Sequence, residues 1–203
     1  RLIMAFEQRG RSGGSRKRSS GFSSSRGGSD ESADAKPARE KKPPTPERLE
    51  QRARNVLLHQ LARSAKSTHQ LRKILEQREI PSEIAERVLV RFTEVGLIDD
   101  QAYAETIVNS RRNFKGLSKS AIKRELNEKG VPAPFIEQAI ESITAEDDLV
   151  AAQELAARRI RQMSTLAKDV RERRLAGYLG RKGYPSSVVF AAIRFAESQL
   201  EFD

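Results

Sequence analysis

The sequence contains no cysteine and no tryptophan, and only two of its 203 residues are histidine. Because thiol groups are absent, disulfide frameworks and thiolate chemistry are excluded, and a reducing cytoplasm is the compartment we expect. The longest apolar run, Val188 to Ile193, has six residues, whereas a membrane-spanning helix needs about 18. No basic segment followed by a long apolar one indicates a signal peptide. We therefore expect neither an oxidised secreted scaffold nor a membrane protein.

Signatures of catalysis are also scarce. The sequence lacks a phosphate-binding loop of the form Gly-x-x-x-x-Gly-Lys-Ser/Thr, and no serine lies in a Gly-x-Ser-x-Gly motif. His59 and His69 lie on different predicted helices, without the further ligands that a metal ion needs, so structural roles are favoured. We expect no enzymatic activity, no cofactor and no metal site; a catalytic site assembled from distant carboxylates stays open.

Charge is abundant and unevenly distributed. The net charge is +10; residues 1–46 hold 11 Lys and Arg against 5 Asp and Glu, whereas the rest hold 27 against 23. Residues 10–29 contain 6 Gly, 8 Ser and 5 basic residues. That composition buries too little apolar surface to fold, so we expect residues 1–46 to be a disordered tail. A basic balance favours a polyanionic partner such as nucleic acid. The simpler alternative is a solubilising tail that only strengthens non-specific attraction to nucleic acid.

The rest of the chain has a helical pattern. Thr45 followed by Pro46 predicts a helix N-terminus. Apolar residues then recur every three or four positions, as in Leu49, Ala53 and Val56. Alternating apolar and polar runs and hairpin turns of the Asn-Gly or Asp-Gly type are absent from residues 47–203. These patterns predict an all-α fold.

Three prolines mark an internal repeat. Pro81, Pro132 and Pro185 lie 51 and 53 residues apart, and we expect each to start the last helix of a repeat. The residues six positions before them are all leucine: Leu75, Leu126 and Leu179. The predicted repeats are residues 47–97, 98–145 and 146–203. Each repeat is too small for a good core of its own, so we expect three tandem three-helix repeats stacked into an elongated, curved, solenoid-like body.

Paired aspartates precede the first helix of the second and third predicted repeats. Asp99-Asp100 and Asp147-Asp148 are each followed by apolar residues at helical spacing. An aspartate at a helix start caps the backbone and interacts favourably with the helix dipole, so we expect both pairs to begin helices. A divalent-metal site is the disfavoured alternative, because each pair lacks a nearby partner carboxylate.

Basic residues cluster where the first helix of each repeat gives way to the second. Cations at a helix C-terminus have a structural explanation, worth about 0.3–1 kcal/mol each, but cations that start the following helix oppose its dipole. A binding role is therefore favoured for these clusters. We expect Arg158, Arg161, Arg171 and Arg174 to form one rigid patch. The candidate binding residues are Arg63, Lys66, Arg72, Lys73, Arg111, Arg112, Lys115, Lys119, Lys123, Arg124, Arg158, Arg161, Arg171 and Arg174.

Short motifs recur along the helical part of the chain: Leu61-Ala-Arg-Ser-Ala-Lys-Ser67, Gly96-Leu-Ile-Asp-Asp100 with Tyr103-Ala104, Ser110-Arg-Arg112, Lys115-Gly116, Lys129-Gly-Val131 and Arg181-Lys-Gly-Tyr184. With these motifs the sequence resembles the RecX family of regulatory proteins over about 150 residues. Glu79 departs from the family pattern, which usually has glycine there, and the basic tail is an addition to the core of the family.

This resemblance implies a modulator of the RecA recombinase that binds the RecA–single-stranded DNA filament and limits its growth. Strand exchange, ATPase and co-protease activities would be damped by occupancy rather than by chemistry. The implied partners are the RecA filament and, weakly or through the filament, single-stranded DNA, with no membrane and with the chain as a monomer. The alternative from another class is a basic helical nucleic-acid-binding module without a RecA target.

Overall fold

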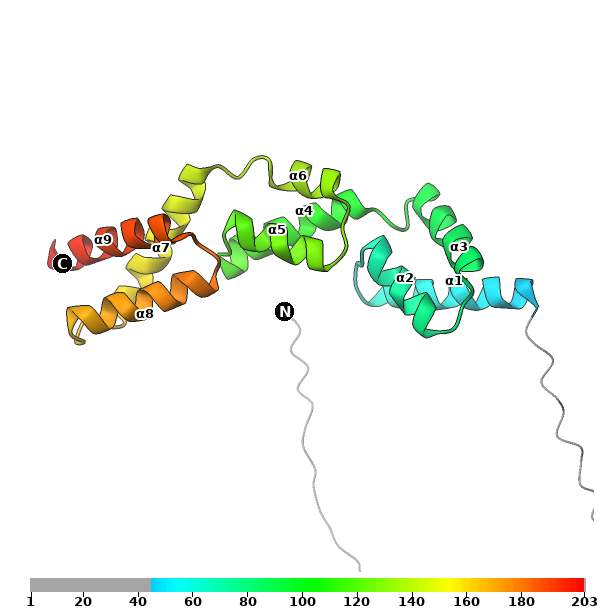
Figure 1. Ribbon diagram of the computed structural model, residues 1–203, viewed down its shortest axis with the longest axis horizontal. Helices are drawn as coiled ribbons and strands as arrows, with labels where there is room; N and C mark the ends of the chain where they lie inside the picture. The colour runs from blue at the N-terminus through cyan, green and yellow to red at the C-terminus, as the bar shows by residue number, and fades with distance from the viewer. Residues whose placement is uncertain (1–44, 203) are drawn as a thin grey trace, which may run out of the picture. The chain divides into compact units, whose positions relative to one another are not determined.

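The computed structural model describes residues 45–202 (Figure 1). Every regular element in this range is helical, which confirms the all-α prediction. The predicted tail, residues 1–46, lies outside the described residues except for Thr45 and Pro46. The elements are α1 (Pro46–Arg63), α2 (Thr68–Gln77), α3 (Ser82–Glu94), α4 (Asp100–Ser110), the π-helical turn η1 (Arg111–Lys115), α5 (Lys119–Glu128), α6 (Ala133–Ile140), α7 (Ala145–Arg161), α8 (Lys168–Arg181) and α9 (Ser186–Phe202).

The helices form three three-helix repeats, as predicted. Each repeat has its own cluster of buried apolar side chains, although its size had suggested that it would lack a good core of its own. Repeat 1 comprises α1 to α3, repeat 2 comprises α4 to α6 with η1, and repeat 3 comprises α7 to α9 (Figure 1). Leu75, Leu126 and Leu179 occupy the same place in each core and are fully buried. Among the described residues, no helix is long and apolar enough to cross a membrane.

Most predicted helix starts are confirmed. Thr45 accepts a hydrogen bond from the backbone N–H of Arg48, and Asp99 accepts one from Ala102 at 2.9 Å. Pro81 and Pro132 are the N-cap residues of α3 and α6. Pro185 directly precedes Ser186, the first residue of α9, so all three prolines start the last helix of a repeat.

The predicted start of the first helix in repeat 3 is wrong. The N-cap of α7 is Thr144, three residues before Asp147, and the two side chains form a capping box with each other's backbone N–H groups. Asp147 therefore lies inside the first turn instead of capping it. Asp148, one residue further on, is directed toward repeat 2.

Two serines hold neighbouring repeats together through backbone carbonyls. The Ser67 hydroxyl at the N-cap of α2 donates to the carbonyl of Lys129 at 2.6 Å, in repeat 2. Ser118, at the N-cap of α5, donates to the carbonyl of Gly183 at 2.7 Å, in repeat 3. In each case the serine also accepts from the third backbone N–H of its own helix. One small hydroxyl thus caps its helix and binds the next repeat.

Two aspartates complete this framework from the other side. Asp100 of α4 accepts from the backbone N–H of Thr68 at 2.8 Å, and Asp148 of α7 accepts from that of Lys119 at 3.1 Å. Each donor is the first residue of the second helix of the preceding repeat, where backbone N–H groups lack partners inside the helix. The carboxylates therefore cap a helix in the neighbouring repeat, a role the sequence analysis did not foresee.

Glycine is required where the second helices of repeats 2 and 3 end against a neighbouring repeat. Gly130 and Gly183 have φ of +70° and +85°. A Cβ atom on Gly183 would lie 2.6 Å from Cβ of Ala121, and one on Gly130 would overlap the His69 side chain. Glu79 adopts the same left-handed conformation in repeat 1, with φ of 58°. The Glu79 side chain is exposed, so among the described residues a side chain fits at this turn despite its backbone strain.

Candidate functional site

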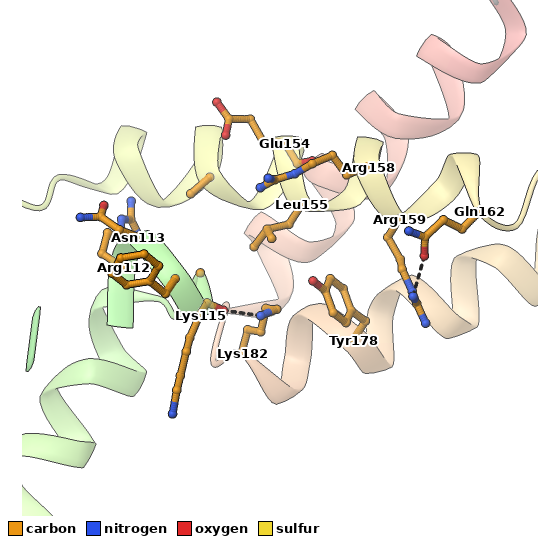
Figure 2. A pocket seen from close by; sticks show the side chains of 13 residues that line it. Arg112, Asn113, Lys115, Glu154, Leu155, Arg158, Arg159, Gln162, Tyr178 and Lys182 are labelled. Atoms are coloured by element: carbon orange, nitrogen blue, oxygen red, sulfur yellow. Dashed lines mark hydrogen bonds between the residues drawn. The ribbon is translucent and has the colours of Figure 1, made fainter. Parts of the chain in front are cut away.

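A basic groove lies between repeats 2 and 3. Its main part has a volume of about 600 Å³ and lies between η1 on one side and the helices α7 and α8 on the other (Figure 2). It contains five cationic side chains and one carboxylate, that of Glu154. The cations are Arg112, Lys115, Arg158, Arg159 and Lys182.

The groove continues along α8. A second depression of about 550 Å³ shares Arg159, Gln162 and Tyr178 with the first. Its further cations are Arg173, Arg174 and Arg181, and no carboxylate lines it. Together these two depressions are called the basic groove below. Such a concentration of one sign of charge in a concave surface focuses the field on an anionic ligand.

The local fold explains how η1 presents one wall of the groove. Five residues in a π-helical turn extend α4, and Gly116 ends the turn with φ of +58°. A Cβ atom on Gly116 would lie 2.9 Å from Cδ1 of Leu155 in α7, so glycine allows the turn to approach α7 closely. π-Helical turns of this kind occur often at functional sites.

Hydrogen bonds fix the floor of the groove. Arg112 donates to Oδ1 of Asp148 at 2.5 Å, and both side chains are less than one-fifth exposed. The Lys182 ammonium donates to the carbonyl of Lys115, as Figure 2 shows. The Tyr184 hydroxyl donates to the carbonyl of Gly116 at 3.2 Å. Burial raises the pKa of Tyr184 to about 12, so the phenol remains a hydrogen-bond donor at neutral pH.

Tyr178 organises the cations in the centre of the groove. The guanidinium carbon of Arg159 lies 5.7 Å from the centre of its ring, and Nζ of Lys182 lies 5.1 Å from it. Cations at these distances are attracted by the negative face of an aromatic ring. Arg159 also donates to Oε1 of Gln162 at 2.7 Å. The two cations are therefore held in place before any ligand arrives.

Several predicted binding residues form ion pairs or hydrogen bonds within the chain. Arg111 makes two hydrogen bonds to the carboxylate of Glu125, at 2.7 and 2.6 Å, and lowers the pKa of that carboxyl group. In repeat 1 Arg72 does the same to Glu86, whose pKa is also lowered. Lys123 pairs with Glu137 at 2.6 Å, Lys119 donates to the carbonyl of Ile143 at 2.7 Å, and Lys66 donates to Ser64 at 2.7 Å.

The four-arginine patch expected in repeat 3 does not form. Arg171 pairs with Glu197 of α9, and the two side chains are only 14% and 7% exposed, so Arg171 is directed inward. Arg158 and Arg174 line different parts of the basic groove, and Arg161 lines neither. The physical reason is that residues three apart on one helix share a face, but a buried carboxylate in a neighbouring helix still decides which way a guanidinium points.

The other predicted residues are distributed as follows. Arg112 and Lys115 line the basic groove, whereas Arg63, Lys73 and Arg124 are exposed on the helices of repeats 1 and 2. The candidate list left out six cationic or aromatic residues of the groove: Phe114, Arg159, Arg173, Tyr178, Arg181 and Lys182. Phe114 stands between basic residues in Arg111-Arg-Asn-Phe-Lys115, which is a sequence signal for a stacking surface that could have found it.

The corresponding groove between repeats 1 and 2 is apolar. Its volume is about 560 Å³, and Leu58 and Leu97 on its walls are 49% and 50% exposed. Leu61, Ala62 and Ala65 line it at the positions that Arg112, Asn113 and Gly116 occupy in repeat 2, 51 residues later. Two equivalent sites in the repeat framework thus carry different chemistry.

Comparisons with known proteins agree with this architecture. Three family models match in order: the first three-helix domain of RecX over residues 53–92, the second over residues 99–140 and the third over residues 146–193. These matches define a regulatory protein built from three helical domains. The chain belongs to the RecX family.

Relatives of similar length support the assignment. The regulatory protein RecX of Streptomyces coelicolor is 43% identical over 157 residues, which cover 77% of this chain and 83% of that protein. RecX of Thermobifida fusca is 37% identical over 73% of this chain and 80% of that protein. A crystal structure of RecX from Lactobacillus salivarius has the same fold, with a TM-score of 0.64 at 19% identity; it covers 74% of this chain and 97% of that one.

Proposed function

We propose that this chain binds the RecA–single-stranded DNA filament in the cytoplasm and limits its growth, and thereby damps ATPase, strand-exchange and co-protease activities in DNA repair and the SOS response. Membership of the RecX family supports a regulatory role. The observation that carries the proposal is the basic groove, where cations from η1, α7 and α8 converge with a single carboxylate among them. A polyanionic filament is the partner that such a surface fits.

The mechanism is occupancy. A regulator that binds one state of the filament more tightly than another shifts the balance between growth and loss of subunits, without a reaction of its own. Cations held in place by Tyr178 and by backbone carbonyls lose little conformational freedom on binding. The chain is expected to act as a monomer and without a cofactor.

The test is a titration of the chain into RecA that hydrolyses ATP on single-stranded DNA. The groove variant carries Arg158→Glu and Arg174→Glu, which reverse two exposed charges in the two parts of the groove. Arg171 is left unchanged, because its replacement would leave Glu197 buried without a partner. The matched control carries Arg52→Glu and Arg87→Glu, two exposed arginines of repeat 1.

We expect the wild-type chain and the control to inhibit the ATPase alike, and the groove variant to need about tenfold more protein or more for the same inhibition. No inhibition by the wild-type chain at several-fold molar excess would refute the proposed function. Equal inhibition by the groove variant would refute the assignment of the groove.

A further inference from the structure

Phe114 is unusually exposed for an aromatic residue. It lies in η1 on the wall of the basic groove, and 87% of its surface is open to solvent. The other exposed large apolar side chains of the described residues reach at most 65%, the value of Phe190. Nothing in the packing of the repeats requires this ring, since no core cluster includes it. An aromatic ring held in water beside cations fits a ligand that offers both flat faces and negative charge.

We propose that the basic groove holds a segment of single-stranded nucleic acid, with a base stacked on Phe114 and phosphates against Arg158, Arg159 and Lys182. The inference deepens the proposed function by naming the ligand that this groove contacts. Base stacking on an exposed aromatic ring combined with a cationic track along the backbone is how proteins bind single strands without reading their sequence.

Tyr178 has a different role from Phe114. The ring of Tyr178 already has Arg159 and Lys182 near it, and Figure 2 shows these side chains gathered between α7 and α8. It is therefore a positioning residue, which directs two cations toward the phosphates. Phe114 has no cation near its ring among the described contacts, and it is the ring available to a base.

Two features favour a single strand over the other polyanions. An acidic protein surface would pair with the cations and could also pack against Phe114, but it does not place a flat ring beside each negative charge as a nucleotide does. A duplex offers phosphates too, yet its bases are stacked on one another and paired, so a side chain reaches their faces only by forcing the stack apart. A single strand provides phosphates and open base faces together.

The test measures binding of the full chain, without RecA, to a labelled single-stranded oligonucleotide and to a hairpin duplex by fluorescence anisotropy. Phe114→Ala removes the proposed stacking ring, and Phe190→Ala removes an exposed phenylalanine outside the groove as a matched control. Arg158→Glu tests the phosphate contact. Phe114→Trp adds a reporter, because the chain has no other tryptophan.

We expect Phe114→Ala to weaken binding of the single strand about fivefold or more and to leave duplex binding unchanged. Arg158→Glu should weaken both, and Phe190→Ala neither. The fluorescence of Trp at position 114 should be quenched by the single strand and not by the duplex. Unchanged single-strand binding by Phe114→Ala, or equal losses for both ligands, would overturn the proposal.

Different outcomes test the contact with the single strand and the regulation of RecA. If the chain does not bind the single strand but the groove variant loses inhibition of RecA, the groove binds an acidic protein surface and the nucleic-acid inference is overturned. If the chain binds single strands through Phe114 but leaves the RecA ATPase unchanged, the inference holds and the proposed function is refuted.

Discussion

The junction between repeats 1 and 2, the first junction, differs from that between repeats 2 and 3, the second junction. At the first, Asp100 accepts one backbone hydrogen bond from Thr68. At the second, Asp148 accepts the equivalent bond from Lys119 and another from the Arg112 side chain. The position of Arg112 is occupied in repeat 1 by Leu61. The hydrogen bonds to the backbone are therefore equivalent at both junctions. The side chains at the end of the first helix of each repeat determine whether the groove there is apolar or basic. One junction leaves an apolar groove and the other a basic one.

The difference shows how a repeat protein separates stability from function. Ser67 and Ser118 and their carbonyl partners join repeats in the same way, so these positions follow the repeat. The groove walls do not follow it, because they face solvent and are free to differ. Function is for this reason expected at the junction where exposed side chains concentrate charge, rather than wherever basic residues are frequent in the sequence.

Repeat 3 differs from the other two repeats at the position of the serine that joins neighbouring repeats. Arg171 lies fourteen residues before Pro185, the position that Ser67 and Ser118 hold relative to Pro81 and Pro132. In repeat 3 the second helix starts earlier, at Lys168, and Arg171 lies within it. In place of the serine that joins two repeats, repeat 3 thus has an arginine that binds Glu197 of its own repeat.

The largest expected effect comes from the glycines at the junctions. Gly183→Ala forces a Cβ atom to within 2.6 Å of Ala121 at a position with positive φ. Crowding costs about 1–3 kcal/mol, and the left-handed backbone adds about 1–2 kcal/mol for a residue with a side chain. Gly96→Ala is the control, because φ is also positive there but nothing lies within 4 Å of the added atom. Urea unfolding should show a clearly larger loss for Gly183→Ala; equal losses would mean that the second junction is not tightly packed.

The next effect separates the two aspartates. Asp148→Ala removes both the cap on α5 and the partner of Arg112, so it should cost about 1.5–3 kcal/mol of unfolding free energy. Asp100→Ala removes only a helix cap, typically worth about 1 kcal/mol. Thermal unfolding of the two variants measures the difference. A larger loss of stability for Asp100→Ala would contradict the view that the aspartate at the second junction makes the stronger interactions.

A smaller effect of opposite sign is expected in repeat 1. Glu79 has φ of 58° and its side chain is exposed, whereas a Cβ atom on Gly130 or Gly183 would meet a neighbouring repeat. Glu79→Gly relieves the strain of the left-handed backbone. Glycine also makes the unfolded chain more flexible, which offsets part of this benefit, so we expect the unfolding free energy to rise by about 0.5–1 kcal/mol. Chemical denaturation detects a gain of this size. A loss of stability would show that the Glu79 side chain makes a contribution that outweighs the strain.

The smallest effect is a difference in acid sensitivity. Hydrogen bonds from Arg111 lower the pKa of Glu125 below its ordinary value of 4.5, so this pair stabilises the fold above that value and the stabilisation is lost as the pH falls through the lowered pKa. Glu86 behaves alike with Arg72, but its side chain is 47% exposed against 24% for Glu125. As the pH falls below 4.5, the unfolding free energy should decrease less in Glu125→Gln than in the wild-type chain, by less than about 1 kcal/mol. Glu86→Gln should show a smaller difference from the wild type, and unfolding at a series of pH values measures both. A larger effect for Glu86→Gln than for Glu125→Gln would contradict the view that the less exposed pair contributes more to stability.

Local patterns in the sequence were enough to predict much of the fold. The three prolines, the leucines six residues before them and the caps at Thr45 and Asp99 depend on neighbours within one helix or turn, so spacing reveals them. The start of α7 was predicted wrongly, because Thr144 competes as a cap and nothing local excludes the later aspartates.

The site was harder to predict, since it depends on contacts between repeats. Whether an arginine faces a partner or a carboxylate of the same chain is decided by residues far away in sequence, as Arg171 and Glu197 show across 26 positions. The π-helical turn that exposes Phe114 arises where α4 meets α7 through Gly116. Composition therefore predicted a basic surface but not which of the cations would form it.

Photo-crosslinking in assembled RecA–single-stranded DNA filaments tests directly whether the basic groove at the second junction contacts the filament. A benzophenone amino acid is placed at position 114 in the basic groove and, in a second sample, at position 58 in the apolar groove of the first junction. We expect crosslinks to RecA or to DNA from position 114 to exceed clearly those from position 58. Crosslinks from position 58 with none from position 114 would contradict this expectation.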